Sequence, residues 1–145
     1  MFFVFSGTLI FAQADWTLDF NKSMSDAKKS KKPVLLLFTG SDWCPPCKML
    51  ERNILGTAEF ENYAKENLIL VKADFPRRPE NQLSKEQKAQ NDNLNMKFGI
   101  RGFPTVVILA PDGTELNRVV GYPGTTSSAF IQNITDKTKG ISKKS

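Results

Sequence analysis

Two cysteines, Cys44 and Cys47, are the residues whose type and spacing could do chemistry in this chain. They stand in the run Trp43-Cys-Pro-Pro-Cys47, directly after an apolar stretch and before a segment of helical periodicity. Two thiols separated by two residues can interconvert between a dithiol and a disulfide, and they can exchange with a foreign disulfide through a mixed disulfide. The pair therefore predicts thiol–disulfide exchange.

Composition removes most other kinds of chemistry, because the 145 residues include no histidine and no third cysteine. A histidine general base, a Ser-His-Asp triad, a Cys-His nucleophile pair and an imidazole-ligated metal are all excluded. Two thiolates cannot complete a tetrahedral zinc site within one chain. We therefore expect no metal and no other cofactor.

The position of the pair at the start of a helix indicates how it would react. Regular helical geometry would hold the two Cβ atoms about 5–6 Å apart, whereas a disulfide needs roughly 3.5–4.5 Å. With Cys44 as the N-cap, its non-helical backbone permits closure, and Pro45 takes the first helical position, where no N–H is needed. Pro46 restricts the backbone of Pro45 and stiffens the turn.

The helix N-terminus also stabilises a thiolate on Cys44. We therefore expect Cys44 to be the exposed, attacking thiol and Cys47 the buried, resolving thiol. A purely structural disulfide is the alternative. In the chain-entropy relation a loop of about four residues gains only ~2 kcal/mol, against ~3 kcal/mol for fifteen residues, so redox activity is favoured.

Alternating apolar runs and helical patterns predict the elements that position this pair. The continuous apolar run Val34–Phe38 is typical of a strand buried on both faces. Strands are expected at 16–20, 34–38, 68–73, 105–109 and 115–120, and helices at 22–30, 48–55, 57–66, 84–98 and 127–137. This alternation predicts an α/β fold with a central mixed sheet of four to five strands, flanked by helices on both faces.

The first fourteen residues are uncharged and mostly apolar, and they end in the small-x-small pattern Ala12-Gln-Ala14. They are too short for the ~20 residues that a membrane-spanning helix needs. We expect a signal peptide over 1–14, a single domain over 15–145, and export to the periplasm or beyond. No Lys or Arg precedes the apolar run, and a buried N-terminal strand is the alternative.

The net charge of +5 is spread over the chain, with its densest cluster at Lys28–Lys32. Basic patches that bind nucleic acid usually add interleaved aromatic side chains or a recognisable reading module. Neither is present in the sequence. We therefore expect a solvated basic surface and no nucleic-acid partner.

Two segments carry a resemblance to the thioredoxin superfamily. Leu36–Met49 resembles its strand, Trp-Cys-x-x-Cys motif and following helix, and Phe98–Thr105 resembles its loop with a cis-proline opposite the cysteines. Gly121 matches a third position in the family's substrate groove. The lead-in Thr39–Cys44 and the polar segment around 76–93 are most similar to secreted bacterial oxidoreductases of the disulfide-isomerase or DsbH-like kind.

The resemblance implies a thioredoxin fold and roles for further residues. It implies a cis bond between Phe103 and Pro104, with the backbone of Phe103 pairing with an extended substrate segment. Trp43 would shield the site and contact substrates, a core position being its alternative, and Lys72 would lie under the buried cysteine. The expected substrate-binding residues are Trp43, Phe103, Pro104 and Gly121, supported by Pro45, Pro46 and Lys72.

One position departs from the family pattern, since the buried acid of the family corresponds to Phe38 here. Proton transfer at Cys47 would then depend on water, Lys72 or Asp42, although Asp42 is more simply a solvated loop residue. The polar segment 75–93 is either a partner-recognition loop or a hydrated extension.

Taken with the cysteine pair, the resemblance predicts an exported thiol–disulfide oxidoreductase that reduces or isomerises disulfides. Its partners would be protein thiols and disulfides and a membrane-bound electron donor or acceptor, and it would be a monomer. The alternatives are a disulfide-forming oxidase, a metal-handling protein and a non-catalytic binding module. Related pairs span potentials from about −270 to −120 mV, and the Pro-Pro dipeptide alone does not place this chain among them.

Overall fold

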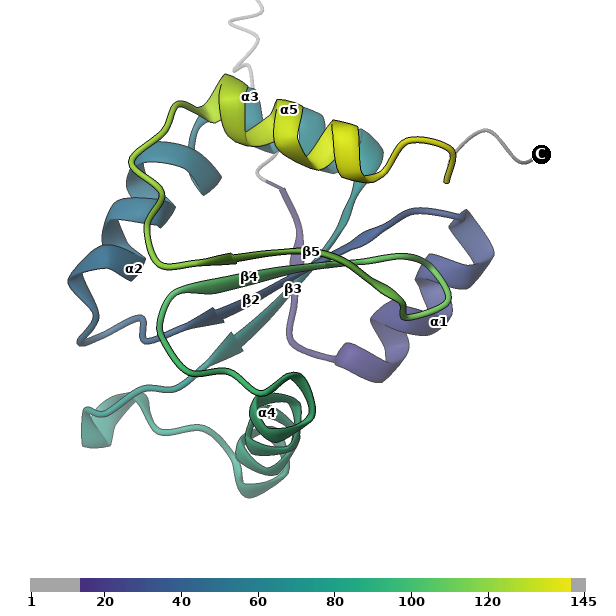
Figure 1. The fold of residues 1–145 in the computed structure, drawn as a ribbon. Coiled ribbons are helices and arrows are strands. Elements are labelled where there is room, and N and C mark those ends of the chain that lie inside the picture. The colour runs from purple at the N-terminus through teal and green to yellow at the C-terminus, as the bar shows by residue number, and fades with distance from the viewer. Residues whose placement is uncertain (1–13, 142–145) are drawn as a thin grey trace, which may run out of the picture.

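The computed structural model describes residues 14–141. They form a five-stranded sheet in the order β1-β3-β2-β4-β5 (Figure 1). Strand β3 is parallel to β1 and β2, whereas β4 is antiparallel to β2 and β5. The strands are β1 (Trp16–Thr17), β2 (Val34–Thr39), β3 (Ile69–Asp74), β4 (Thr105–Leu109) and β5 (Glu115–Val120). The expected mixed α/β sheet is therefore confirmed.

Helices cover both faces of this sheet (Figure 1). Helices α3 (Ala58–Asn67) and α5 (Ser127–Lys137) pack on one face, and α1 (Phe20–Ser30) and α4 (Lys85–Phe98) lie on the other. The helix that carries the cysteines, α2 (Pro45–Leu50), follows β2. Within residues 14–141, no helix combines the length and apolar character needed to cross a membrane.

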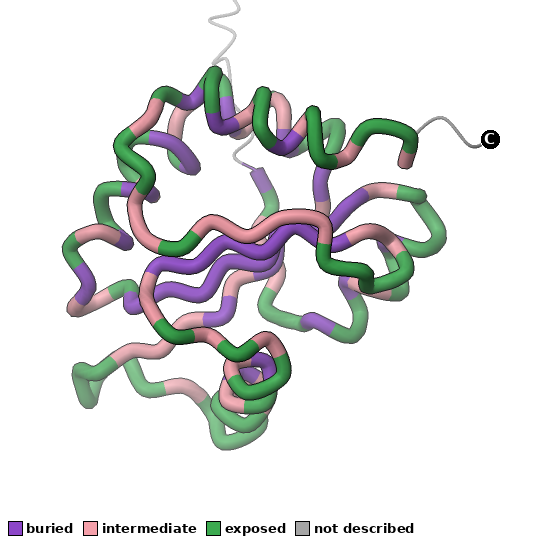
Figure 2. Tube along the Cα trace, viewed as in Figure 1, coloured by how far each residue is buried: buried purple, intermediate pink, exposed green. Residues whose placement is uncertain are grey.

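Strand β2 forms the centre of the core, because all six of its residues are buried (Figure 2). Leu35 and Leu37 point toward the face covered by α3 and α5, whereas Leu36 and Phe38 point toward the face covered by α1 and α4. Burial on both faces explains why this strand is a continuous apolar run rather than an alternating one. The loop that leads from β2 to the two cysteines therefore begins at a strand that is packed on both faces.

The N-terminal region differs from the sequence-based prediction. The first strand ends at Thr17, because the carboxylate of Asp19 accepts the backbone N–H of Lys22 at 3.0 Å and caps α1. Phe20 therefore begins the helix, where its ring packs edge-on against Phe98 with centroids 6.2 Å apart. The prediction of a strand to residue 20 was wrong.

The residues before α1 are also held by α4. The side-chain amides of Gln87 and Gln90 both donate to the carbonyl of Leu18, at 2.9 and 2.8 Å. Ser84 is the N-cap of α4, since its side chain accepts the N–H of Gln87 at 3.1 Å. Of the expected signal peptide, residues 1–13 lie outside the described part, and Ala14 packs into the core.

The helix that contains Cys47 agrees with the prediction at its start, where Pro45 is the first helical residue, and differs from it only in its last part. There, Glu51–Leu55 forms a π-helical turn. The N–H of Gly56 closes this turn on the carbonyl of Glu51 at 2.6 Å. A Cβ at residue 56 would lie 2.8 Å from that carbonyl oxygen, so the close approach requires glycine.

Candidate active site

Cys44 is the N-cap of α2, as the sequence predicted. Its backbone is extended, with φ −103° and ψ 102°, and its sulfur accepts the N–H of Cys47 at 3.3 Å. Pro45 occupies the first helical position, so the turn loses no hydrogen bond to proline. The two cysteines form a disulfide, with Cα atoms 5.3 Å apart. The chain is thus shown in its oxidised state.

The burial of the two cysteines corrects one prediction. Cys44 is only 2% exposed and Cys47 4% exposed, so the expected exposure of Cys44 is wrong for the disulfide form. The reason is local, because the disulfide holds the Cys44 sulfur against Cys47, whose own sulfur receives the N–H of Gly40 at 3.5 Å. Pro45 and Lys48 form the exposed part of this region, and Pro46 is half-buried.

The second loop of the predicted site contains a cis bond between Phe103 and Pro104, as expected. Pro104 precedes β4, whose residue Thr105 pairs with Phe38 near the end of β2. The carbonyl of Pro104 accepts the N–H of Gly121 at 2.7 Å. Gly121 has φ +83°, a left-handed conformation that favours glycine. The cis-proline loop therefore lies at the same edge of the sheet as the cysteines.

Trp43 connects these two loops. Its ring meets that of Phe103 edge-on, with centroids 5.8 Å apart, and its indole N–H donates to the carbonyl of Phe75 at 2.8 Å. The guanidinium of Arg77 lies 3.5 Å from the centre of the indole. A side chain at Gly40 would overlap the indole on another side. Trp43 is half-buried and sits among loop residues rather than in either core cluster.

Asp42 lies in the loop between β2 and α2 and forms hydrogen bonds with the segment 75–83. Its carboxylate accepts the backbone N–H groups of Arg77 at 3.0 Å and Arg78 at 2.9 Å, and the side-chain amide of Asn81 at 3.1 Å. These donors, that of Arg77 foremost, lower the pKa of Asp42 to about 2. A carboxyl group this acidic carries no proton near neutral pH, which argues against a proton shuttle at Asp42.

Lys72 lines a cavity beside Cys47, the second cysteine of the disulfide. This cavity has a volume of about 290 Å³ and is also lined by Ser41, Lys48 and Glu51. The Lys72 ammonium lies 5.1 Å from the centre of the Trp16 ring. Phe38 is fully buried against Phe98, so the departure from the family's buried acid is real. Ionisable side chains, among them Lys72 and Glu51, instead line a cavity together with Cys47.

Phe75 and Arg77 contact Trp43, and sequence reasoning assigned a role to neither. The signal that could have found them is topological. Segment 75–83 leaves the end of β3, which is parallel to β2, and the carboxyl ends of neighbouring parallel strands open at one edge of the sheet. Within residues 14–141, no group of three side chains of the types His, Cys, Asp and Glu could hold a metal ion.

Comparison with known proteins agrees with this geometry. A model of the thioredoxin-like domain matches residues 20–135. The disulfide bond reductase DsbH of Chlamydia pneumoniae is 31% identical over 128 residues, which are 88% of this chain and 75% of that protein. The thioredoxin-related protein DsbJ of the same organism is 27% identical over 114 residues, 78% of this chain and 32% of DsbJ.

Solved structures give the same result. A DsbH oxidoreductase superposes with a TM-score of 0.82 at 30% identity, covering 88% of this chain and 86% of the other. The oxidised C-terminal domain of Neisseria meningitidis DsbD has a TM-score of 0.59 at 20% identity, covering 81% and 90%, and so shares the fold. This chain therefore belongs to the thioredoxin-like family, and its Cys44–Cys47 pair is the redox couple of a thiol–disulfide oxidoreductase.

Proposed function

We propose that this protein reduces or isomerises disulfides of other proteins, with Cys44 as the attacking thiol. The observation that supports this is the position of the Cys44 sulfur at the start of α2, where it accepts the N–H of Cys47. On reduction, that donor and the helix N-terminus stabilise a thiolate on Cys44.

The reaction proceeds in two exchanges. The Cys44 thiolate attacks one sulfur of the substrate disulfide, a new S–S bond forms, and the other substrate sulfur leaves as a thiolate. The Cys47 thiolate then attacks the Cys44 sulfur and releases the second substrate thiolate. Two electrons pass to the substrate, and the protein ends in the disulfide state described above.

Substrate chains bind beside the cis-proline loop in this proposal. Pro104 has no N–H, so no donor competes at that point, and the backbone of Phe103 pairs with an extended substrate segment as an added strand. Trp43 and Gly121 flank this loop, one through the ring of Phe103 and the other through the carbonyl of Pro104.

Proton transfer at Cys47 is proposed to use the cavity that contains Lys72. The buried residue Phe38 has no ionisable group, whereas the cavity admits water and presents the Lys72 ammonium and the Glu51 carboxylate beside Cys47. Water in this cavity would take the Cys47 proton when the mixed disulfide is resolved, and Lys72 would stabilise the thiolate that forms.

The direction of electron flow is proposed from the relatives. DsbH is named a disulfide bond reductase, so we favour a monomeric reductase or isomerase that a membrane-bound donor returns to its dithiol form. DsbD, a thiol:disulfide interchange protein, is among the matched relatives. A redox titration of the Cys44–Cys47 couple tests the direction. A potential near that of thioredoxin, roughly −270 mV, supports a reductase, and one near roughly −120 mV supports an oxidase.

Export is proposed from the apolar residues 1–14 alone, with cleavage after Ala14. Mass spectrometry of the protein recovered from the periplasm or the medium should find Asp15 as the first residue. Recovery of the chain in the cytosol with Met1 retained would contradict export but would leave the dithiol chemistry untouched.

The insulin-reduction assay tests the central claim. The wild-type protein should catalyse reduction of insulin by dithiothreitol, and Cys44→Ser should abolish this catalysis. Cys47→Ser should instead accumulate a mixed disulfide with the substrate, which non-reducing gel electrophoresis detects. If Cys44→Ser retained full activity, the chain would act as a binding module and the proposal would be wrong.

A further inference from the structure

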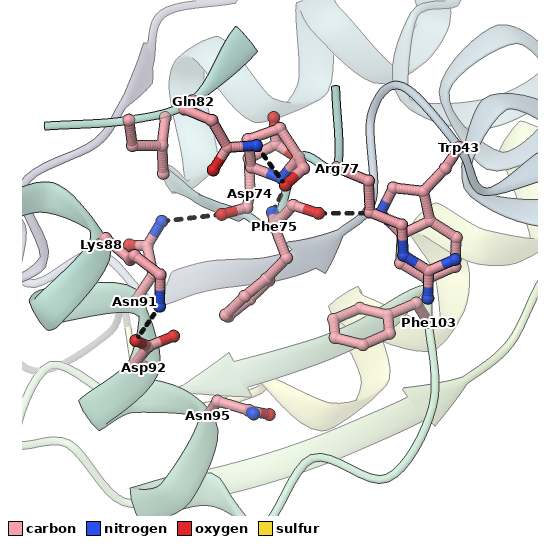
Figure 3. A pocket seen from close by; sticks show the side chains of 12 residues that line it. Trp43, Asp74, Phe75, Arg77, Gln82, Lys88, Asn91, Asp92, Asn95 and Phe103 are labelled. Atoms are coloured by element: carbon pink, nitrogen blue, oxygen red, sulfur yellow. Dashed lines mark hydrogen bonds and ion pairs between the residues drawn. The ribbon is translucent and has the colours of Figure 1, made fainter. Parts of the chain in front are cut away.

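A second cavity shares Trp43 and Phe103 with the candidate site and is not lined by Lys72. It has a volume of about 360 Å³ and lies between the segment 75–83 and α4. Figure 3 shows that its walls differ in chemistry, with aromatic rings at one side and side-chain amides of α4 at the other. The volume is within the range of pockets that bind small groups, roughly 300–1,000 Å³.

The aromatic wall consists of Trp43, Phe75 and Phe103. The rings of Phe75 and Phe103 have centroids 5.3 Å apart with an interplanar angle of 54°, and Phe103 meets Trp43 edge-on. All three residues are only half-buried, although they are large and apolar. A further aromatic ring would extend this cluster in the tilted or edge-on geometry that such rings prefer.

The opposite wall contains two asparagines that differ in hydrogen bonding. The Asn91 amide donates to the carbonyl of Asp74 at 3.0 Å, and its oxygen accepts from Gln87 and Gln90. In Asn95 the oxygen Oδ1 is buried and has no hydrogen-bond partner in the described part of the chain. Asn95 lines the cavity, and the last torsion of asparagine is broad, so a rotation of this amide would bring the oxygen toward a ligand there. An unpaired buried acceptor favours a ligand that donates a hydrogen bond.

We propose that this cavity binds a tyrosine side chain that flanks the substrate's disulfide cysteine. Its ring would lie against Phe75 and Phe103, and its hydroxyl would donate to Oδ1 of Asn95. The charges that border the cavity balance, with Arg77 and Lys88 against Asp74 and Asp92, so the lining does not favour a charged side chain over a neutral one. Acidic side chains would bring no donor to Asn95. The inference rests on the proposed function, since it names a substrate feature for the same site.

The cavity is continuous with the place where substrate is proposed to bind. Phe103 belongs to both, because its backbone precedes Pro104 and its ring lines the cavity. Side chains of an extended segment alternate between its two sides. When a substrate cysteine faces Cys44, a residue beside that cysteine therefore points away from the disulfide, toward Phe103 and the cavity.

The test compares disulfide-linked model peptides that differ only in the residue before the cysteine, which is Tyr, Phe or Ala. The wild-type protein should reduce the Tyr peptide with a kcat/KM about tenfold above that of the Ala peptide, and roughly fivefold above that of the Phe peptide. Equal values for the three peptides would overturn the proposal.

Substitutions on α4 test whether Asn95 is responsible for the preference for the Tyr peptide. Asn95→Leu removes the amide, so the difference between the Tyr and Phe peptides should disappear while the preference for both over Ala persists. Met96→Ala is the matched control, because Met96 is next to Asn95 on α4 and is 79% exposed outside the cavity. It should keep the wild-type ratios. A Tyr preference unchanged in Asn95→Leu would contradict the assignment of the hydroxyl to Asn95.

A binding measurement separates this proposal from the proposed function. Peptides with serine in place of cysteine cannot exchange thiols, yet the Tyr version should shift the amide resonances of Asn95 and the indole resonance of Trp43 more strongly than the Ala version. Such binding without any peptide reduction would support the pocket and refute the reductase. Reduction without these shifts would support the reductase and refute the pocket.

Discussion

The two sides of the Cys44–Cys47 disulfide differ in character. The Cys47 side opens into a cavity lined by ionisable groups, among them Lys72 and Glu51. Next to Cys44 in the chain, Trp43 meets the ring of Phe103, which packs on Phe75, and Asp42 accepts hydrogen bonds from the segment 75–83. The difference indicates that proton handling and substrate recognition use separate surfaces, so a substitution on one side should leave the other intact.

Among substitutions that test this difference, we expect Trp43→Ala, on the substrate-recognition side, to lower activity the most. Trp43→Ala removes ring contacts with Phe103 and Arg77 and the hydrogen bond to Phe75. Loss of a central aromatic contact typically costs about 2 kcal/mol or more in binding, roughly 30-fold. We expect kcat/KM for protein substrates to fall by about this factor while the redox potential of the pair stays within about 15 mV of wild type. A large change in the potential would show that Trp43 acts on the chemistry as well.

A smaller effect is expected on the proton-handling side. Lys72→Met removes the ammonium beside Cys47 and should slow resolution of the mixed disulfide roughly tenfold, because water in the cavity still accepts protons. Stopped-flow measurement of resolution against pH should show the deficit shrinking at higher pH, where Cys47 ionises without help. Lys65→Met, an exposed lysine on α3, is the control. A deficit independent of pH would indicate a structural role for Lys72.

The smallest effect on activity is expected at Asp42. Asp42→Asn replaces a charged acceptor of three hydrogen bonds, so it should loosen the segment 75–83 and raise KM about threefold with kcat nearly unchanged. Limited proteolysis should cut the variant faster within this segment. The exposed Asp136→Asn on α5 should behave like wild type. If proteolysis of the Asp42 variant were unchanged, the segment would be held by its other contacts.

Asp42 also predicts a dependence on pH. Its pKa is about 2 in the folded chain against 3.8 for the ordinary value. A lowered carboxyl pKa contributes stability that is fully present above pH 3.8 and is lost as pH falls toward 2. Segment 75–83 of wild type should therefore become protease-sensitive over this acidic window. In Asp42→Asn the sensitivity should not change with pH over the same window.

Much of this molecule could be predicted from local sequence signals. The buried strand β2 was predicted from its apolar run, and the helical start at Pro45 was predicted from the proline after Cys44. Each signal involves only neighbouring residues, and both predictions are confirmed. The helix start at Phe20 could not be predicted in this way, because burial of its ring against Phe98, 78 residues further along the chain, overrides the alternating pattern. The π-helical turn at Glu51–Leu55 similarly depends on closure at Gly56.

The candidate site was predicted in part for the same reason. The sequence motifs located Cys44, Cys47 and Pro104, because each has its own spacing signal. The burial of Cys44 accompanies closure of the disulfide, and the contact of Arg77 with Trp43 arises only when the loops that follow β2 and β3 meet in space. The segment 75–93 contributes contacts to the active-site loop through Arg77 and Arg78, a role that its polar composition left open.

The hydrogen bonds from Gln87 and Gln90 to the Leu18 carbonyl have a practical consequence. They hold the helix that forms one wall of the tyrosine cavity against Leu18, the fourth residue after the expected cleavage point. An affinity tag fused directly to Asp15 would lie close to these hydrogen bonds and would disturb the position of α4 at the cavity. Purification handles for this protein therefore belong at the C-terminal end.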